Sequence, residues 1–416
     1  MTSITQTSET PLKAEDVLKF ILIHSWLFGV FFVINYYVID WIPSFTVDFW
    51  DVGWYRNIVE NGYWYSANGQ SNVAFFPLFP WVLKLLDGQL VLASLLNLLL
   101  FLTGLIILYI VYKPSKYIIP ILLAIPSNLF LYVPYSESIF YLAVVLFLVG
   151  MDKRNIMLAC IGIFLASMAR SSFSIFVPAL LITGAFFSLK ERKLKWEYIL
   201  YLITSLAGLA IVLFIMYYQT GEPWGIFKAQ RQWGHHFRMP EMPFFTYMGT
   251  LKIDGVALLV GAISLIPLIK ITLGTLLKKM EIEISPSVFF SLLYFVGISL
   301  SIVFFQGGDL RSLNRYVFAT PFIFFFFIYL FKQQFHFTKS ALIILVGSLL
   351  FWLIFYDITH SIRVFANYLA VSIFLSAFIY LTHPQFKKGV FWVLYLGMLY
   401  LQAYYFVRFL TGQWVG

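Results

Sequence analysis

Long apolar runs alternate with short polar segments along almost the whole chain, and many of the runs approach twenty residues. A helix needs ~20 apolar residues to cross the hydrocarbon core of a bilayer. Because no water is available there, the backbone of a spanning segment must satisfy its own hydrogen bonds as a helix. The pattern therefore predicts an all-α polytopic membrane protein with about 11–13 transmembrane helices. The expected spans up to residue 305 are 18–40, 90–112, 116–131, 139–151, 156–169, 173–189, 196–218, 251–277 and 288–305, with about three or four more beyond.

Composition supports this class and excludes a soluble one. Hydrophobic residues make up 61% of the chain and charged residues only 11%, whereas a soluble domain carries roughly a quarter charged residues. The polar N-terminus shows no cleavage-site pattern, so we expect no removable signal peptide. The single cysteine, Cys160, lies in an apolar run and is expected to pack as a small hydrophobe.

The positive charge is distributed unevenly between the loops. Short cytoplasmic loops of membrane proteins are rich in lysine and arginine, and placing the lysine clusters inside gives a consistent topology. It makes 1–17 a cytoplasmic tail, 41–89 a first outer loop with interfacial helices, and 219–250 a second long outer loop. All of them belong to a single transmembrane domain, 1–416.

The outer side then carries mostly single arginines. A guanidinium binds phosphate through a planar fork of donors, so an arginine-lined outer cavity suits an anionic lipid phosphate. Interfacial snorkelling or helix C-capping explains any one of them equally well. These arginines are Arg56, Arg170, Arg231, Arg238, Arg311, Arg315, Arg363 and Arg408.

Asp48 and Asp51 are the candidate catalytic residues, because a partly desolvated carboxylate at a membrane surface can act as a general base. Their spacing puts both on one face if the segment is helical. The alternative is that one of them caps the helix expected to begin near Val52.

Other polar residues cluster at the ends of later spans. Glu137 begins a span, with Ser136 as its expected N-cap, and Arg170 between two short spans needs an anionic partner. The adjacent His235 and His236 lack further ligands, so we expect no metal. The remaining candidate substrate-binding residues are Gln230, Arg231, Trp233, Arg311, Arg315 and Tyr316.

Several short motifs follow one another along the chain: Trp50-Asp51, Asn61-Gly62-Tyr63, AFFPLFP at 74–80, YSES at 135–138, Arg170-Ser171, and Arg315-Tyr316 with Pro321. They occur in the order found in the PIG-V family of mannosyltransferases, which includes GPI mannosyltransferase II, and the chain resembles a prokaryotic relative of that family. The family has a basic or aromatic residue soon after the aspartate, and Trp54 and Tyr55 are the candidates for that position and for contact with the substrate. Ser172-Phe173 departs from the family pattern, in which Asn-Gly follows Arg-Ser.

The resemblance implies a GT-C fold and inverting transfer of a hexose, mannose in the family, from a polyprenyl- or dolichyl-phosphate sugar to a lipid-linked or glycan acceptor. Asp51 would be the base, while Glu137, Arg170 and Arg315 would bind the donor phosphate or the acceptor. The lipid-phosphate sugar would be a co-substrate, and no cofactor, metal or nucleic acid is expected. The membrane would be the plasma membrane of a prokaryote or the endoplasmic reticulum of a eukaryote.

Two alternative hypotheses for the function remain open from the sequence. A membrane transporter or lipid flippase would show broken helices and mid-membrane charges, whereas most charges here lie at the ends of spans. A non-catalytic subunit of the same fold would tolerate Asp51→Asn. The sequence does not say whether an accessory membrane subunit is required.

Overall fold

The computed structural model describes residues 14–38, 46–246, 251–277, 283–333, 337–383 and 385–415. These residues form helices, with one isolated bridge between Phe245 and Asp309. The expected all-α architecture of a polytopic membrane protein is therefore confirmed. Most of the expected cytoplasmic tail, 1–13, lies outside the described residues, as do 39–45 and 247–250 of the two expected outer loops.

Nine helices in the described part of the chain are long and apolar enough to cross a membrane, two of them counted with a short 3-10 segment at one end. They are α1 (Ala14–Val38), α4 (Leu90–Tyr112), η3 (Ser171–Ile175) with α8 (Phe176–Glu191), α9 (Trp196–Thr220), α11 (Leu251–Leu276), α12 (Pro286–Phe305), α15 (Phe337–Phe355), α16 (Ile362–Ala377) with η4 (Phe378–Thr382), and α17 (Lys387–Leu410).

The remaining helices are shorter, and several of them lie between the long ones. They are α2 (Asp51–Asn61), η1 (Asn72–Ala74), α3 (Leu78–Leu85), α5 (Ile118–Leu123), η2 (Pro126–Leu131), α6 (Glu137–Asp152), α7 (Ile156–Ala169), α10 (Gly225–Gln232), α13 (Leu313–Phe318) and α14 (Phe322–Phe331).

The expected span at 116–131 is not a continuous helix, and this prediction was wrong. The segment forms α5 and η2, because Pro126 favours an extended conformation at the preceding residue, and Ile125 adopts φ −58°, ψ 127°. The break leaves carbonyls without helical partners. The side-chain amide of Gln402, on α17, donates to the carbonyls of Leu123 and Ile125 at 2.9 Å each. A buried amide thus makes the break tolerable in an apolar bundle.

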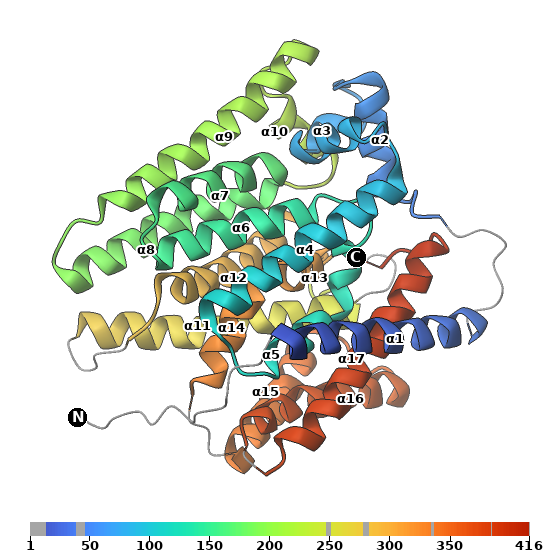
Figure 1. Ribbon diagram of the computed structural model, residues 1–416, viewed down its shortest axis with the longest axis vertical. Helices are drawn as coiled ribbons and strands as arrows, with labels where there is room; N and C mark the ends of the chain where they lie inside the picture. The colour runs from blue at the N-terminus through green and yellow to red at the C-terminus, as the bar shows by residue number, and fades with distance from the viewer. Residues whose placement is uncertain are drawn as a thin grey trace.

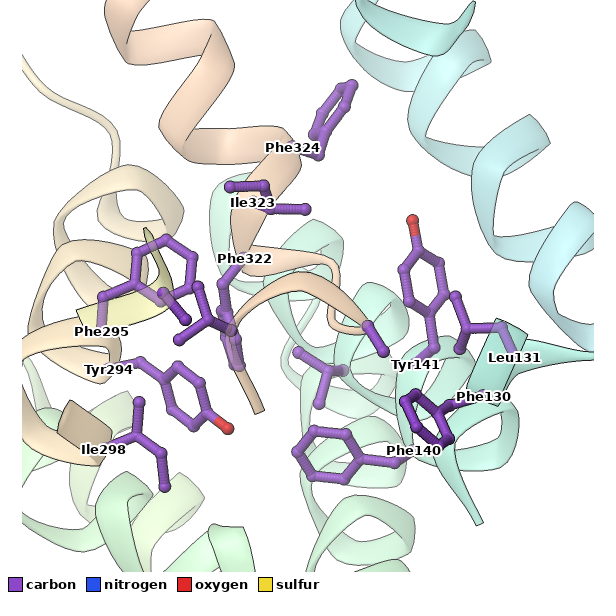
Figure 2. Close-up of a cluster of buried hydrophobic side chains, with 14 of the residues drawn as sticks. Phe130, Leu131, Phe140, Tyr141, Tyr294, Phe295, Ile298, Phe322, Ile323 and Phe324 are labelled. Atoms are coloured by element: carbon purple, nitrogen blue, oxygen red, sulfur yellow. The ribbon is translucent and has the colours of Figure 1, made fainter. Parts of the chain in front are cut away.

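Helix α6 lies at the centre of the bundle, against α7, α4 and α12, while α1 packs on α17 and α15 on α16 (Figure 1). Small residues permit the close approach of α6 and α7: a Cβ on Gly162 would lie 2.3 Å from the backbone nitrogen of Phe147. Aromatic side chains fill the space between α6, α12 and α14, where the rings of Tyr294 and Phe322 stack at 4.0 Å (Figure 2).

The short helices α2, α3 and α10 gather at one end of the bundle, beside the C-terminal end of α9 (Figure 1). Hydrogen bonds tie the first loop to the second. Gln219 accepts from the backbone N–H of Tyr63 at 2.7 Å, and Gln232 donates to the carbonyl of Ser66 at 2.6 Å. The two long loops therefore form one polar layer at this end.

Candidate functional site

Helix α2 begins at Asp51 after an unusual backbone conformation. Trp50 has φ 58° and ψ −115°, which a bulky residue adopts only under strain. No side chain caps the helix, so the capping alternative for the aspartates is not observed. Instead, the Asp51 carboxylate accepts a hydrogen bond from Nη2 of Arg315 at 2.8 Å. The strained backbone of Trp50 therefore immediately precedes the candidate base, Asp51.

Glu137 lies beneath this pair and joins two arginines. Its Oε1 contacts Nε of Arg315 at 2.8 Å and Nη2 of Arg315 at 2.6 Å, and it also pairs with Arg170. The side chains of Glu137, Arg315 and Arg170 are 1%, 5% and 8% exposed. Buried charges like these require partners, because an unpaired one would be very costly. Glu137 is thus the counter-ion of both arginines.

Ser136 does not cap α6 with its side chain, contrary to expectation. Its hydroxyl oxygen accepts a hydrogen bond from Tyr55 at 3.1 Å, which ties α2 to the start of α6. Burial, together with the negative charges of Asp51 and Glu137, raises the pKa of Tyr55 above its usual value. Tyr55 therefore stays protonated and able to donate.

Aromatic rings hold the arginines from the other side. The guanidinium of Arg315 lies 4.7 Å from the ring centre of Phe130 and 4.9 Å from that of Tyr135, and Arg170 lies 4.8 Å from the ring of Tyr316. Burial alone would lower the pKa of Arg315, but Glu137 and Asp51 hold it well above its usual value. Arg315 is therefore a permanent cation.

The short helix α13 is fixed from below by a buried acid on α11. Asp254 accepts from the backbone N–H of Asn314 at 2.9 Å and from its side-chain amide at 2.7 Å. This anchoring places Arg315 at the end of the bundle nearest α2. Asp254 carries no obvious signal in the sequence, because it lies in a long apolar run.

A cavity of about 340 Å³, here the Asp51 cavity, opens above this network. Among the described residues that line it, Asp51 is the one acid, whereas four are arginines. It is lined by Asp51, Tyr55, Gln70, Ala74, Phe75, Phe76, Ser136, Ala169, Arg170, Ser171, Gln230, Trp233, Gly234, His235, Arg238, Gln306, Arg311, Ser312, Arg315, Tyr316 and Trp414.

The structure brings most of the predicted site residues to this cavity. Glu137 lies behind the wall, and Trp54 stacks on Phe75 at 5.7 Å as support for it. Arg231 is exposed and does not line the cavity. The predicted residues that do line it are Asp51, Tyr55, Arg170, Gln230, Trp233, Arg311, Arg315 and Tyr316.

Asp48 and Asp51 do not share a helix face, because Asp48 precedes α2. Asp48 pairs with Arg56 and accepts no contact from Arg315. It does not line the cavity, so the geometry separates the two aspartates that the sequence left together.

Arg238 and Gln306 line the cavity but were not among the predicted site residues. The segment 236–245 runs along 304–310, with backbone hydrogen bonds such as that from Arg238 N–H to the Phe304 carbonyl at 2.9 Å. Nη2 of Arg238 donates to the Gln306 carbonyl at 2.6 Å. Gly307 permits this approach, because a Cβ there would lie 2.1 Å from Nε of Arg238. The adjacent glycines Gly307 and Gly308 were the signal in the sequence for such a close approach.

His235 also lines the cavity, and both of its ring nitrogens face side-chain amides. Its Nδ1 lies 2.6 Å from Oε1 of Gln230, and its Nε2 lies 3.5 Å from Nε2 of Gln306. Burial lowers the pKa of His235, and Arg311 lowers it further. No group of three or more metal-ligating side chains occurs within the described part of the chain.

Comparison of the chain with protein-family models, with curated proteins and with solved structures finds no match.

Proposed function

We propose that the protein is an integral membrane glycosyltransferase that moves a hexose from a polyprenyl-phosphate sugar to a hydroxyl group of a lipid-linked or glycan acceptor. The observation that carries this proposal is the lining of the Asp51 cavity, which combines one accessible carboxylate with four arginines. Inverting transfer from a sugar phosphate needs a base for the acceptor and cations for the departing phosphate. The cavity offers both in one place.

In the proposed reaction, Asp51 takes the proton of the acceptor hydroxyl as its oxygen attacks the anomeric carbon. The bond between that carbon and the phosphate oxygen breaks, and the polyprenyl phosphate leaves with the electron pair. Arg315 holds the Asp51 carboxylate at 2.8 Å, which fixes its orientation. No second carboxylate is required as an acid, because a phosphate leaves readily.

The arginines divide into two groups in this proposal. Arg170 and Arg315 both pair with Glu137, Arg315 also pairs with Asp51, and both arginines are more than nine-tenths buried. Arg311 is 44% exposed beside Asp309, and Arg238 contacts a backbone carbonyl. Because the side chains of Arg238 and Arg311 are accessible whereas Arg170 and Arg315 are buried, we assign the leaving phosphate to Arg238 and Arg311 rather than to the buried pair.

The long apolar helices suit a lipid-linked donor that approaches from the bilayer, with the cavity at the expected extracytoplasmic end. The resemblance to PIG-V enzymes favours mannose over other hexoses and a prokaryotic plasma membrane over the endoplasmic reticulum. Mannose and the plasma membrane are therefore part of what we propose.

The test uses purified protein in lipid, radiolabelled polyprenyl-phosphate mannose or glucose, and a lipid extract that supplies the acceptor. Asp51→Asn removes the base with almost no change of shape, and we expect transfer to fall by about 10²–10⁴-fold. Asp48→Asn is the matched control, since it makes the same change outside the cavity, and it should retain transfer.

Equal transfer by wild type and Asp51→Asn would refute the catalytic role. If the wild-type protein transfers neither sugar but moves labelled lipid between leaflets, the flippase alternative replaces the proposal.

A further inference from the structure

The C-terminal residues after α17 build part of the Asp51 cavity, although they lie almost a hundred residues beyond Arg315 in the sequence. The chain turns back at the end of α17, where the backbone N–H of Gln413 donates to the Arg408 carbonyl at 2.9 Å. The Arg408 guanidinium donates to the Gln413 side chain at 2.7 Å. This turn places Trp414 in the cavity wall.

The same segment packs on the strained backbone that precedes Asp51. Gly412 has φ +76°, and a Cβ there would lie 3.0 Å from Cε1 of Phe49. The Trp414 indole meets that of Trp50 edge to face, with ring centres 4.8 Å apart. Val415 is buried. The C-terminal turn therefore has a defined place beside the candidate base.

The N–H groups of the two indoles have no hydrogen-bond acceptor among the described residues. Nε1 of Trp50 and Nε1 of Trp414 are both buried and have no hydrogen-bond partner. Folded proteins pair almost all such groups. Both indoles are therefore held by ring packing alone, and Trp414 is also among the residues that line the Asp51 cavity.

The chemistry of this wall suits a pyranose ring. The C–H groups of a sugar face carry partial positive charge and pack on the negative face of an indole, while its hydroxyls form hydrogen bonds with polar groups beside the ring. An isoprenoid chain offers no hydrogen-bonding group to such a wall, and a phosphate would bind the arginines instead. Gln230 and Gln306 add amide groups to the lining of the same cavity.

We propose that Trp414, supported by Trp50, is the subsite for the hexose ring of the sugar donor, so that the C-terminal turn decides how tightly the sugar is held. This inference rests on the proposed function and adds a residue that contacts substrate. Polyprenyl phosphate without a sugar would not use the subsite.

The experiment compares wild type with Trp414→Ala, Trp414→Phe and Trp392→Ala. Trp392 is a partly exposed tryptophan near the other end of α17, which makes it the matched control. Binding of radiolabelled polyprenyl-phosphate hexose is measured beside binding of sugar-free polyprenyl phosphate, and transfer kinetics are measured in parallel.

We expect Trp414→Ala to weaken binding of the sugar-bearing lipid and raise its KM by about tenfold, with little change for the sugar-free lipid. Trp414→Phe should lose less, because it keeps an aromatic face, and it also serves if Trp414→Ala folds poorly. Trp392→Ala should behave as wild type. A merely structural role for Trp414 would weaken both lipids equally.

Unchanged sugar binding and KM in both Trp414 variants would overturn the subsite. If Asp51→Asn still abolishes transfer in that case, the proposed function survives without it. If wild type shows no preference for the sugar-bearing lipid and transfers no hexose, the proposed function fails and the subsite with it.

Discussion

The two ends of the bundle each contain a cavity, and the two cavities differ in the balance of charged residues that line them. The Asp51 cavity combines four arginines with one acid. A second cavity of about 420 Å³, here the Asp152 cavity, lies near the start of α9 and combines three basic with three acidic residues. Because α9 has 25 residues, its two ends are about 37 Å apart. The charged residues of the Asp152 cavity are Asp152, Arg154, Lys190, Glu191, Lys195 and Glu197.

The buried acids of the two regions are satisfied by different partners. Asp152 accepts hydrogen bonds from the hydroxyls of Tyr112 and Ser287 and from the backbone N–H of Ser287. Glu137 is instead held by two buried arginines. At Asp152, neutral hydrogen-bond donors are enough to satisfy the acid and to connect the ends of α4, α6 and α12. A network of buried ions costs more free energy of desolvation than neutral hydrogen bonds do. Because such networks are common at functional sites, its place next to the Asp51 cavity favours that cavity as the functional one.

The largest expected difference between the regions is the free energy lost when each buried acid becomes an amide. Glu137→Gln leaves Arg170 buried without its counter-charge and leaves Arg315 with Asp51 alone, so it should lower the free energy of unfolding by about 3–5 kcal/mol. Asp152→Asn removes a charge whose hydrogen-bond donors are neutral, and it should cost about 1 kcal/mol. Reversible unfolding in mixed micelles measures both values. Equal losses would show that counter-charge does not distinguish the two acids.

The helical architecture could be predicted from the sequence because an apolar run of sufficient length has few alternatives in a bilayer. The break at Ile125 had a local signal in Pro126, but the partner that makes it tolerable, Gln402, comes from 277 residues further along the chain. Such long-range pairing is not visible in a single sequence.

The candidate site was predictable where residues stand next to recognisable motifs, as at Asp51, Arg170 and Arg315. It was not predictable where only folding brings residues together. Trp414 has no motif around it, and Asp254 resembles any acid in a long helix. The sequence favoured Asp51 over Asp48 but did not separate them decisively, because the strained turn at Trp50, which lies between them, depends on tertiary packing.

A smaller effect is expected from the glycine that admits Arg238 to the Asp51 cavity. Gly307→Ala forces an alanine to φ +65° and places its Cβ 2.1 Å from Nε of Arg238, so the guanidinium must move. Gly221→Ala is the matched control, since Gly221 has φ +70° with open space around it. Both should lose about 1–2 kcal/mol of unfolding free energy from the backbone alone.

Only Gly307→Ala should also raise the KM for the lipid-phosphate donor, because only it displaces a proposed phosphate ligand. Thermal or denaturant unfolding and transfer kinetics separate the two consequences. An equal KM in both variants would remove Arg238 from the phosphate site.

The smallest expected effect is a pH dependence that belongs to the Asp51 cavity. Because burial and Arg311 lower the pKa of His235 in the folded protein, the unfolded chain binds the proton more readily. The stability that neutral His235 contributes is thus fully present above about pH 6.5, the usual histidine value, and is lost as the pH falls below it. One proton changes the free energy of unfolding by at most about 1.4 kcal/mol per pH unit. His235→Gln should therefore flatten the fall in the free energy of unfolding between pH 7.5 and 5.5, whereas the same change at exposed His360 should not.

The expected neutral form of His235 fits the amides on both sides of the ring, with Nδ1–H donating to Gln230 and Nε2 accepting from Gln306. A pH profile identical in wild type and His235→Gln would mean that His235 is no less basic in the folded cavity than in the unfolded chain. The arginines that line the cavity would then exert less electrostatic influence on their neighbours than a phosphate-binding role requires.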